Sequence, residues 1–330
     1  MVSVNDYTYS MENSSKKISV VIPVYNESTN ILKVIERLDK VFMRLNYRHE
    51  YIFVDDGSVD ATANLLKDMH ELNGNIHYIE LSKNFGHQNA LKAGLDMACG
   101  DCIISMDGDL QHPPELLPLF IAKWEEGHEI VYSRRRASES NSAYKKFTSN
   151  LFYNLLNKVS EVKLEQGTAD FRLIDRKVAD ILLQFNEIEP FLRGIVKWVG
   201  FSQYAIDYDA EQRFSDKSKY SLKKMLRLAM QGMTSFSIRP LYTAVFIGFS
   251  ISLLSLLYLP YVIYSMMAGK AIAGWASIIT TIVFFGGLQI TLMGVIGIYV
   301  GKIFLQTKLR PNYIIRNTSL DYKRYDLAKF

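Results

Sequence analysis

The chain has 330 residues, a length that corresponds to about two domains. Its formal net charge is only +4, with 38 basic and 34 acidic residues, so the charge balance does not indicate a nucleic-acid-binding protein. The two cysteines, Cys99 and Cys102, have the spacing of a redox or zinc motif. No second Cys/His pair accompanies them, and Cys102 begins an expected strand, so we expect two reduced structural thiols.

Buried strands and helices alternate along the first 115 residues. The expected strands, each a short apolar run, cover residues 17–23, 51–55, 76–81 and 103–106. The expected helices cover residues 30–45, 61–72 and 90–98, with Asn26, Ser28 and Thr29 as N-cap candidates for the first and a loop at 83–89 before the third. This βαβαβαβ order predicts a mainly parallel sheet that binds ligands along one edge. No Gly-x-Gly-x-x-Gly or Gly-x-x-x-x-Gly-Lys-Ser/Thr motif opens a helix, which argues against a dinucleotide oxidoreductase and a P-loop nucleotidase.

The fourth expected strand leads directly into an Asp-x-Asp pair. Asp107 and Asp109 are followed by Gln111 and two prolines, and a helix can begin at Pro114 or Glu115. At the carboxyl end of a strand, these carboxylates and the amide are expected to converge on a ligand. Such oxygen ligands suit Mg²⁺ or Mn²⁺ bridging nucleotide phosphates, and the alternative is a polar turn with two solvated acids.

Two uncharged runs dominate the C-terminal part of the chain. No charged residue occurs from Leu241 to Gly269 or from Ala271 to Gly301, and each run exceeds the roughly 20 residues that cross a bilayer. Residues 239–302 are therefore expected to form two transmembrane helices, at about 241–264 and 275–300, rather than a buried hairpin of a soluble domain. The spacing Gly297-x-x-x-Gly301 allows close helix packing within this hairpin or between subunits of a homo-oligomer.

Basic residues flank both uncharged runs. Residues 211–240 carry seven Lys/Arg and the segment from Lys302 onward carries another seven. Because positive residues stay on the cytoplasmic side, both termini and the N-terminal domain are expected in the cytoplasm. The polar start of the chain gives no sign of a cleavable signal peptide.

Several motifs in fixed order carry a resemblance to a known family. They are Val21-Ile-Pro-Val-Tyr-Asn-Glu27, Val54-Asp-Asp-Gly-Ser58, Asp107-Gly-Asp-Leu-Gln-His-Pro-Pro-Glu115, Gly167-Thr-Ala-Asp-Phe-Arg-Leu-Ile-Asp-Arg176 and Arg213-Phe-Ser-Asp-Lys-Ser-Lys-Tyr220. The first three resemble the inverting nucleotide-sugar glycosyltransferases of family 2, which have the α/β GT-A fold. The last two resemble the polyprenyl-phosphate branch of that family, which includes dolichol-phosphate mannose synthase and the bactoprenol glucosyltransferases. The resemblance spans roughly residues 17–310.

The resemblance implies a domain order and a set of site residues. A polar segment at 1–16 precedes a GT-A domain at 17–220. The domain is followed by a juxtamembrane amphipathic helix at 221–238, the membrane helices and a basic cytoplasmic tail at 303–330. The implied nucleotide-binding residues are Pro23, Tyr25, Glu27, Asp56 and Asp107. Each of these could instead be only a turn or cap residue. The implied metal ligands are Asp107, Asp109 and Gln111, for Mg²⁺ or Mn²⁺, and the implied catalytic residues are Asp109, Asp170 and Arg213.

Asp170 is the residue expected nearest the transferred sugar. In relatives an Asp at this place is a general base, but a phosphate monoester acceptor, with a second pKa of about 6, is already ionised near neutral pH. Asp170 is therefore a candidate for orienting a sugar hydroxyl or stabilising an oxocarbenium-like transition state, and the structural alternative is a helix cap or an ion pair with Arg172 or Arg176.

Cations are expected to bind the acceptor phosphate. The candidates are Arg134, Lys145, Ser149, Arg213 and Lys219, and the alternative for the cations is attraction to anionic lipid head groups. Two amphipathic stretches, at 144–159 and 221–238, have the pattern of helices that lie in a membrane surface.

The resemblance implies transfer of a hexose to a polyprenyl phosphate on the cytoplasmic face of a bacterial plasma membrane. Glucose from UDP-glucose and undecaprenyl phosphate are the first expectation. GDP-mannose, UDP-galactose, UDP-N-acetylglucosamine and an aminoarabinose nucleotide are alternative donors. The alternative of another class is a non-catalytic membrane-bound sensor of nucleotide sugars. The Gln-x-x-Arg-Trp stretch of processive synthases is not found, which argues against polymer export.

Overall fold

The computed structural model describes residues 15–136, 167–188, 190–208, 239–256, 260, 264, 267 and 274–321. The described residues belong to two units, one made of 15–136, 167–208 and 311–321 and the other of 239–310. The strands are β1 Lys17–Val24, β2 Arg48–Asp55, β3 Ile76–Leu81, β4 Cys102–Ser105, β5 Ile130–Arg135, β6 Thr168–Asp175, β7 Gln203–Tyr208 and β8 Ile315–Thr318. The helices are α1 Ile31–Phe42, α2 Thr62–Leu72, α3 His87–Met97, the 3₁₀ turn η1 Pro114–Leu116, α4 Leu117–Glu125, α6 Arg176–Leu182, α7 Leu192–Trp198, α9 Arg239–Leu256 and α11 Trp275–Thr307.

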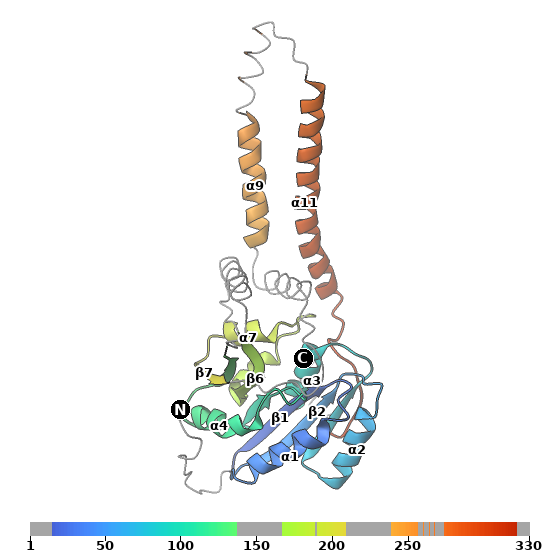
Figure 1. Ribbon diagram of the computed structural model, residues 1–330, viewed down its shortest axis with the longest axis vertical. Coiled ribbons are helices and arrows are strands. Elements are labelled where there is room, and N and C mark those ends of the chain that lie inside the picture. Colours follow the sequence, from blue (N-terminus) through green and yellow to red (C-terminus); the bar gives the residue numbers. More distant parts are fainter. Residues whose placement is uncertain are drawn as a thin grey trace. The chain divides into compact units, whose positions relative to one another are not determined.

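All eight described strands form one sheet, in the order β7-β5-β6-β4-β1-β2-β3-β8 (Figure 1). The β1/β2, β1/β4 and β2/β3 pairs are parallel, as the βαβ order predicted, and the β5/β7 pair is also parallel. The β4/β6, β5/β6 and β3/β8 pairs are antiparallel. The sheet is thus mixed but mostly parallel. The antiparallel strand β6 in its interior and the edge strand β8 were not anticipated from the sequence.

The core forms because alternate strand residues meet the apolar stripes of helices. On one face, Ile18, Val20 and Ile22 of β1 pack in a single cluster with the buried stripes of α1 and α4. In the sequence of α1, the apolar residues with helical spacing are Ile31, Val34, Ile35, Leu38 and Val41, and all five are buried. The predicted N-cap candidates are wrong, because Asn30 occupies that position and makes no side-chain cap hydrogen bond. Asn26 instead adopts a left-handed backbone conformation and accepts a hydrogen bond from the backbone N–H of Val59.

Helix α3 packs on the opposite face of the sheet. A Cβ atom at Gly94 would lie 2.2 Å from a methyl carbon of Val21, so the absence of a side chain there lets the helix approach the strands. The helix begins at His87, three residues earlier than predicted, directly after Gly86 with its φ of +92°. A positive φ of this kind suits glycine, and it turns the chain from β3 into the helix. The consequence is that His87 and Gln88 stand on a rigid element rather than in a loop.

The two cysteines are free thiols, as predicted. Cys102 begins β4 and is fully buried, and burial together with nearby carboxylates raises the pKa of its thiol well above the usual range. Because the thiolate is the reactive form, a thiol in this environment is structural.

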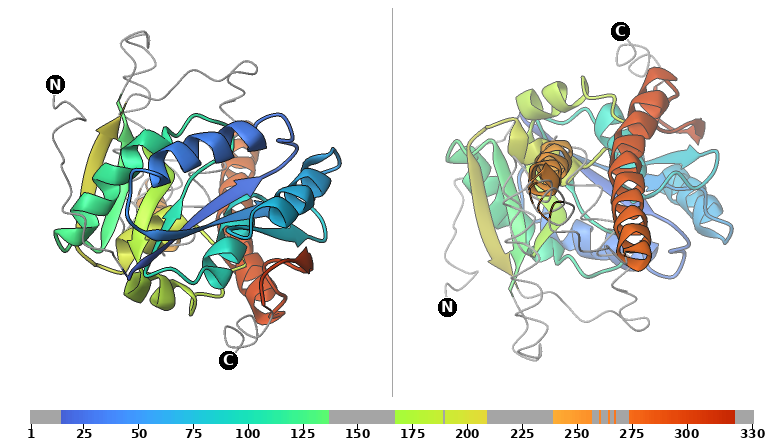
Figure 2. Two further views of the ribbon diagram at one scale, coloured as in Figure 1. Left: turned by 90° about the horizontal axis from the view of Figure 1, so that it is seen from below. Right: turned by 90° about the horizontal axis from the view of Figure 1, so that it is seen from above.

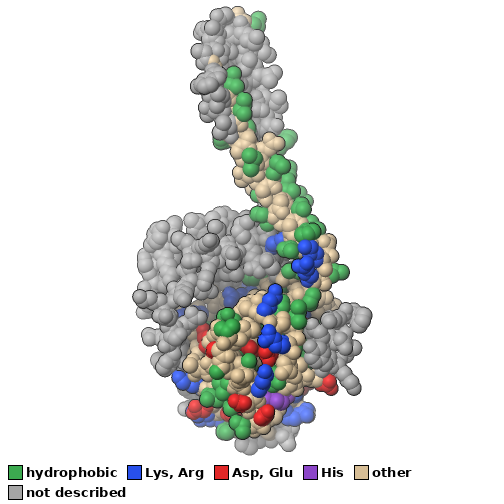
Figure 3. Space-filling model, turned by 90° about the vertical axis from the view of Figure 1, so that its right-hand side faces the viewer, with side chains coloured by type: hydrophobic (Ala, Val, Ile, Leu, Met, Phe, Trp, Pro, Cys, Tyr) green, Lys and Arg blue, Asp and Glu red, His purple; other side chains and the backbone are tan. Residues whose placement is uncertain are grey.

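The second unit contains the apolar helices α9 and α11. The segment Phe284–Thr307 of α11 is long and apolar enough to cross a membrane, and Leu241–Ser250 of α9 is a shorter apolar segment. Hydrophobic side chains recur on the surface of α11, whereas acidic and basic side chains gather on the domain that contains the sheet (Figure 3). Gly248 of α9 lies close to a Leu292 methyl group of α11, so the two helices are in contact. The amphipathic stretches at 144–159 and 221–238 lie outside the described residues.

Candidate active site

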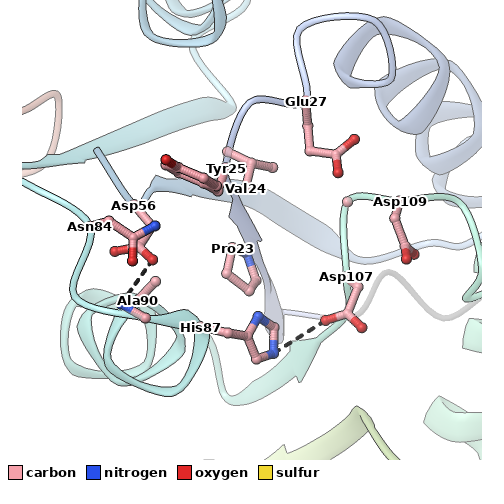
Figure 4. Close-up of a pocket in the computed structure, with 12 residues that line it drawn as sticks. Pro23, Val24, Tyr25, Glu27, Asp56, Asn84, His87, Ala90, Asp107 and Asp109 are labelled. Carbon is pink, nitrogen blue, oxygen red and sulfur yellow. Dashed lines mark hydrogen bonds and ion pairs between the residues drawn. The ribbon is translucent and has the colours of Figure 1, made fainter. Parts of the chain in front are cut away.

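A pocket opens at the carboxyl-terminal edge of the sheet, where β1, β2 and β4 end beside the start of α3 (Figure 4). Its lining residues are Pro23, Val24, Tyr25, Glu27, Asp56, Asn84, Gly86, His87, Ala90, Asp107, Gly108 and Asp109. The structure therefore brings together all five residues predicted to bind a nucleotide, and it adds Asp109 to them. Gln111 and Asp170 are not among the lining residues.

Asp56 organises the wall of the pocket that follows β3. Its two carboxylate oxygens accept hydrogen bonds from the backbone N–H groups of Phe85, at 2.7 Å, and Gly86, at 3.0 Å. Burial raises the pKa of this carboxyl, although the two hydrogen bonds oppose the shift. The neighbouring Gly57 has a φ of +71°, and a Cβ atom there would lie 2.4 Å from the carbonyl carbon of Lys83. The Asp-Gly pair thus holds the Lys83–Gly86 loop against the end of β2.

The Asp-x-Asp turn is held by His112, whose ring stacks on Phe171. The backbone N–H of Asp107 donates to Nδ1 of His112, at 3.0 Å, and the buried His112 ring stacks on Phe171 with centroids 5.0 Å apart. Within the turn, Oδ1 of Asp109 accepts from the backbone N–H of Gln111, at 3.1 Å. The following residues begin the 3₁₀ turn at Pro114, as predicted. The turn is therefore an ordered part of the fold.

The donor set of this turn fits a divalent metal that is shared with a phosphate ligand. In the part of the chain that the structure describes, no group of three or more His, Cys, Asp or Glu side chains is arranged to hold a metal alone. Oδ1 of Asp107 is nevertheless buried and accepts no hydrogen bond from the described residues, and its nearest charged neighbour is Nε2 of His87, at 3.4 Å. Carboxylate oxygens are the ligands that Mg²⁺ and Mn²⁺ prefer, and phosphate oxygens and water commonly complete their coordination. The residues present thus suit a metal held partly by its substrate.

Charge supports the same conclusion about the metal. Four carboxylates line the pocket, from Glu27, Asp56, Asp107 and Asp109, and its described lining contains no Lys or Arg. His87 is the one lining side chain that can carry a positive charge. A diphosphate entering this pocket would meet like charge, which disfavours binding unless a cation compensates it.

Asp170 reaches the site because β6 runs antiparallel to β4. Ser105 of β4 pairs with Arg172 of β6, so the start of β6 lies beside the end of β4, where Asp107 follows. Nε2 of His87 lies 3.4 Å from Oδ1 of Asp107 and 3.6 Å from Oδ2 of Asp170, and it bridges the two carboxylates. The connection from His87 to Asp107 is drawn in Figure 4.

The carboxylate of Asp170 is buried and holds two arginines. Arg193 of α7 donates to both of its oxygens, at 3.0 and 2.8 Å, and Arg172 donates at 3.0 Å. Gln88 of α3 adds a fourth hydrogen bond, at 3.0 Å. Burial favours the neutral acid, but Arg193, His87 and Arg172 together hold the pKa of Asp170 well below its usual range. The ion pair with Arg172, which was the structural alternative for Asp170, is therefore present, whereas Arg176 donates to the backbone carbonyls of Gly100 and Ala98.

His87 also has a shifted pKa. Burial lowers the pKa of its imidazole, but the adjacent Asp170 and Asp107 raise it, and the net direction is upward. The two carboxylates therefore stabilise the protonated form of the ring relative to its neutral form. Sequence reasoning missed His87, Gln88 and Arg193 as site residues. The first two had a usable signal, because they directly follow the loop glycine Gly86 at a strand end, but Arg193 lies in a helix with no motif around it.

Of the residues predicted to bind the acceptor phosphate, the structure describes only Arg134. Arg134 lies within β5, which continues to Arg135, and forms a two-point ion pair with Asp207 of β7, with contacts at 2.6 and 3.0 Å. The candidates outside the described residues are Lys145, Ser149, Arg213 and Lys219. The acceptor side of the site therefore stays a prediction.

The mixed, mostly parallel sheet, with carboxylates gathered at the ends of its parallel strands, agrees with the GT-A fold that the sequence motifs implied. The glycosyl transferase family 2 model matches residues 19–183, half of the chain, and the protein belongs to that family. This identification agrees with the family that the sequence motifs resembled.

Relatives match over nearly the whole chain. The uncharacterized glycosyltransferase YkcC of Bacillus subtilis is 40% identical over 91% of this chain and 93% of its own length. The bactoprenol glucosyl transferase of Shigella phage SfV is 37% identical over 91% of this chain and 98% of its own. A prophage bactoprenol glucosyl transferase homolog of Escherichia coli is 36% identical, with the same coverage. Among solved structures, the glucosyl-3-phosphoglycerate synthase of Mycobacterium tuberculosis in complex with Mn²⁺, UDP and phosphoglyceric acid is 18% identical over 67% of this chain and 77% of that chain, with a TM-score of 0.47.

Proposed function

We propose that this protein transfers glucose from UDP-glucose to a polyprenyl phosphate, undecaprenyl phosphate in the first instance, with inversion at the anomeric carbon. The observation that carries the proposal is the similarity to bactoprenol glucosyl transferases along 91–92% of the chain, at 36–37% identity. The pocket supports the proposal, because its lining offers an aromatic ring for a base and carboxylates for ribose hydroxyls and for a metal on the diphosphate.

The nucleotide would lie across the ends of β1 and β2. Tyr25 is 45% exposed at the pocket, so its ring is available to stack on a base beside Pro23. Glu27 and Asp56 supply carboxylate oxygens that accept from base or ribose donors. Asn84 and Gly86, on the loop that Asp56 holds, close the remaining wall.

The diphosphate would lie at the Asp-x-Asp turn. Asp107 and Asp109 would hold Mg²⁺ or Mn²⁺ there, with Gln111 adjacent. When bound, the metal would neutralise the negative charge that develops on the departing diphosphate. His87, next to Asp107, adds a proton donor and positive charge on the same side of the pocket. These groups make it unnecessary to protonate the leaving group.

The acceptor would attack from the side of Asp170. Its phosphate oxygen needs no base, because a phosphate monoester with a second pKa of about 6 is largely ionised near neutral pH. We infer that Asp170 holds Arg193 and His87 in place near the sugar and does not remove a proton. Arg134, Lys145, Ser149, Arg213 and Lys219 remain the proposed contacts of the acceptor phosphate.

The membrane arrangement is also a proposal. We infer that α11 and the uncharged run Leu241–Gly269, which begins within α9, span a bacterial plasma membrane, with the catalytic domain and both termini in the cytoplasm. The apolar length of Phe284–Thr307 and the basic residues on either side of the two runs support this topology. Assembly into a homo-oligomer through Gly297 and Gly301 is possible in this arrangement.

A transfer assay tests the proposal. Purified full-length protein is supplied with undecaprenyl phosphate, Mg²⁺ or Mn²⁺, and one radiolabelled nucleotide sugar at a time. We expect label to enter the organic phase with UDP-glucose. Transfer from another donor alone would keep the chemistry and replace the sugar. Slow hydrolysis of a donor without lipid labelling would refute the acceptor, and binding without any turnover would favour the nucleotide-sugar sensor.

A further inference from the structure

The chain beyond the apolar helix α11 returns to the catalytic sheet. Only five residues, Lys308–Asn312, separate the end of α11 from Tyr313, and Ile315–Thr318 then form the edge strand β8. This strand pairs antiparallel with β3, with Ile79 opposite Thr318 and Leu81 opposite Ile315. Figure 2 shows β8, in dark red, at the edge of the sheet. The C-terminal end of β3, which leads into the pocket, is therefore covered by residues from the far end of the sequence.

Both backbone polar groups of Ser82 bind this segment. The N–H of Ser82 donates to the carbonyl of Ile314, at 2.9 Å, and the carbonyl of Ser82 accepts from Nη2 of Arg316, at 2.7 Å. Ser82 immediately precedes the Lys83–Gly86 loop, whose other end donates two N–H groups to Asp56. The loop is thus anchored at one end by the C-terminal segment and at the other end by a carboxylate of the pocket.

Arg316 bridges the loop and the strand before it. Its Nη1 lies 3.2 Å from Oε1 of Glu80 while its Nη2 binds the carbonyl of Ser82. Glu80 is also paired with Lys67 of α2, at 3.0 Å, so it keeps a cation if Arg316 is removed. A change at Arg316 therefore acts mainly on the contact with Ser82.

The same segment also braces α3, the helix on the other side of the loop. Tyr313 is buried, and its hydroxyl donates to Oδ2 of Asp96, at 2.7 Å. Asp96 also forms a buried ion pair with Lys92, one helical turn earlier. The N-terminal end of this helix carries His87 and Gln88, which contact Asp107 and Asp170. Residues 313–318 therefore contact both elements that flank the loop.

We propose that residues 313–316 are a positioning element for the donor site, in which Arg316 fixes the Lys83–Gly86 loop so that its amides stay on Asp56 and Asn84 faces the nucleotide. The role in donor binding rests on the proposed function of the pocket, whereas the ordering of the loop does not. Arg316 contacts Glu80 and Ser82, so its replacement is expected to leave the positions of Asp107, Asp109 and Asp170 unchanged. The expected defect is consequently weaker nucleotide binding with an unchanged use of the lipid acceptor.

The test compares Arg316→Gln with Thr318→Val in the full-length protein. Thr318 is a matched control, because its hydroxyl donates to the carbonyl of Tyr78, at 2.9 Å, three residues before Leu81 and away from the loop. Hydrogen exchange is followed in peptides covering residues 82–86, and binding of UDP and of GDP is measured by calorimetry. In Arg316→Gln we expect roughly ten-fold faster exchange in these peptides and roughly ten-fold weaker binding of the nucleotide that the wild type prefers, the scale of one charge-assisted hydrogen bond. In Thr318→Val both quantities should stay at wild-type values.

The exchange measurement decides the proposal independently of the transfer reaction. Unchanged exchange of residues 82–86 in Arg316→Gln would overturn it, as would an equal increase in Thr318→Val, which would indicate general loosening of the edge. Faster exchange with unchanged nucleotide affinity would overturn the role in donor binding. If the wild-type protein transfers no sugar to lipid, the proposed function fails, and a faster exchange confined to Arg316→Gln would still support the positioning of the loop.

Discussion

Replacing Asp170 by asparagine should destabilise the catalytic domain as well as stop transfer. The buried carboxylate accepts three hydrogen bonds from Arg172 and Arg193 and one from Gln88. An asparagine keeps the size but turns an NH₂ group toward these donors and leaves Arg172, which is 3% exposed, without its counter-charge. Breaking such a buried pair costs about 3–5 kcal/mol, and since Arg193 keeps partial access to water we expect about 3 kcal/mol. At 2–4 °C per kcal/mol for a domain of this size, the melting temperature should fall by roughly 6–12 °C.

Thermal unfolding in detergent, followed by circular dichroism, measures this effect, and Asp207→Asn is its matched control. Asp207 also binds one arginine through two contacts, to Arg134, but on the surface, where such a pair contributes about 0–1 kcal/mol. Equal losses of melting temperature in the two variants would refute the reasoning from burial. The pKa of Asp170 is held below its unfolded value of about 3.9, so its stabilisation is complete above that pH and is lost as the pH falls toward the folded pKa. The difference between wild type and Asp170→Asn should therefore be constant above about pH 5 and shrink below about pH 4.

Three further predictions concern binding and turnover. Asp109→Asn should abolish transfer without changing the melting temperature. The control is Asp180→Asn, at an exposed carboxylate on α6, which should leave transfer unchanged. Near-normal turnover of Asp109→Asn with metal present would contradict the role of the Asp-x-Asp pair. Arg213→Ala should raise KM for undecaprenyl phosphate at least ten-fold more than it weakens UDP binding, the effect of losing one charged contact to phosphate, and an equal loss of both would contradict the acceptor role. Removing divalent metal with EDTA should weaken UDP binding in calorimetry, because four carboxylates line the pocket, and unchanged affinity would show that the metal does not compensate them.

The parallel half of the fold could be predicted because its signals are local. Each of β1 to β4 contains a short apolar stretch that leads to a proline, an acid or a polar loop, although β2 begins at Arg48, three residues before the predicted start. Helical spacing placed the buried face of α1 correctly. The unanticipated strands β6 and β8 pair with segments that are distant in sequence. β8 contains Ile315-Arg-Asn-Thr318, with a single apolar residue, and becomes a strand because the edge of β3 offers unpaired backbone groups. Periodicity within a segment carries no information about such a partner.

The site residues that follow the parallel strands could also be predicted, because their signals are local in sequence. Pro23, Tyr25, Glu27, Asp56 and the Asp-x-Asp pair each follow a strand, and parallel strands bring their carboxyl ends to one edge. The partners of Asp170 could not be found in this way, because Arg193 lies 23 residues further along the chain and reaches it only through the packing of α7.

The reversal of β6 explains why the carboxylate of Asp170 suits positioning better than proton transfer. A general base needs a free lone pair and a pKa near the working pH. The antiparallel strand instead brings Asp170 under α3 and α7, where both oxygens bind guanidinium groups and its pKa is lowered. The same contacts hold Arg193 and His87 at the side of the pocket where the Asp-x-Asp turn ends, so the buried carboxylate of Asp170 fixes two cationic side chains. An acceptor that arrives already ionised requires such cations to guide it and leaves a base without a proton to remove.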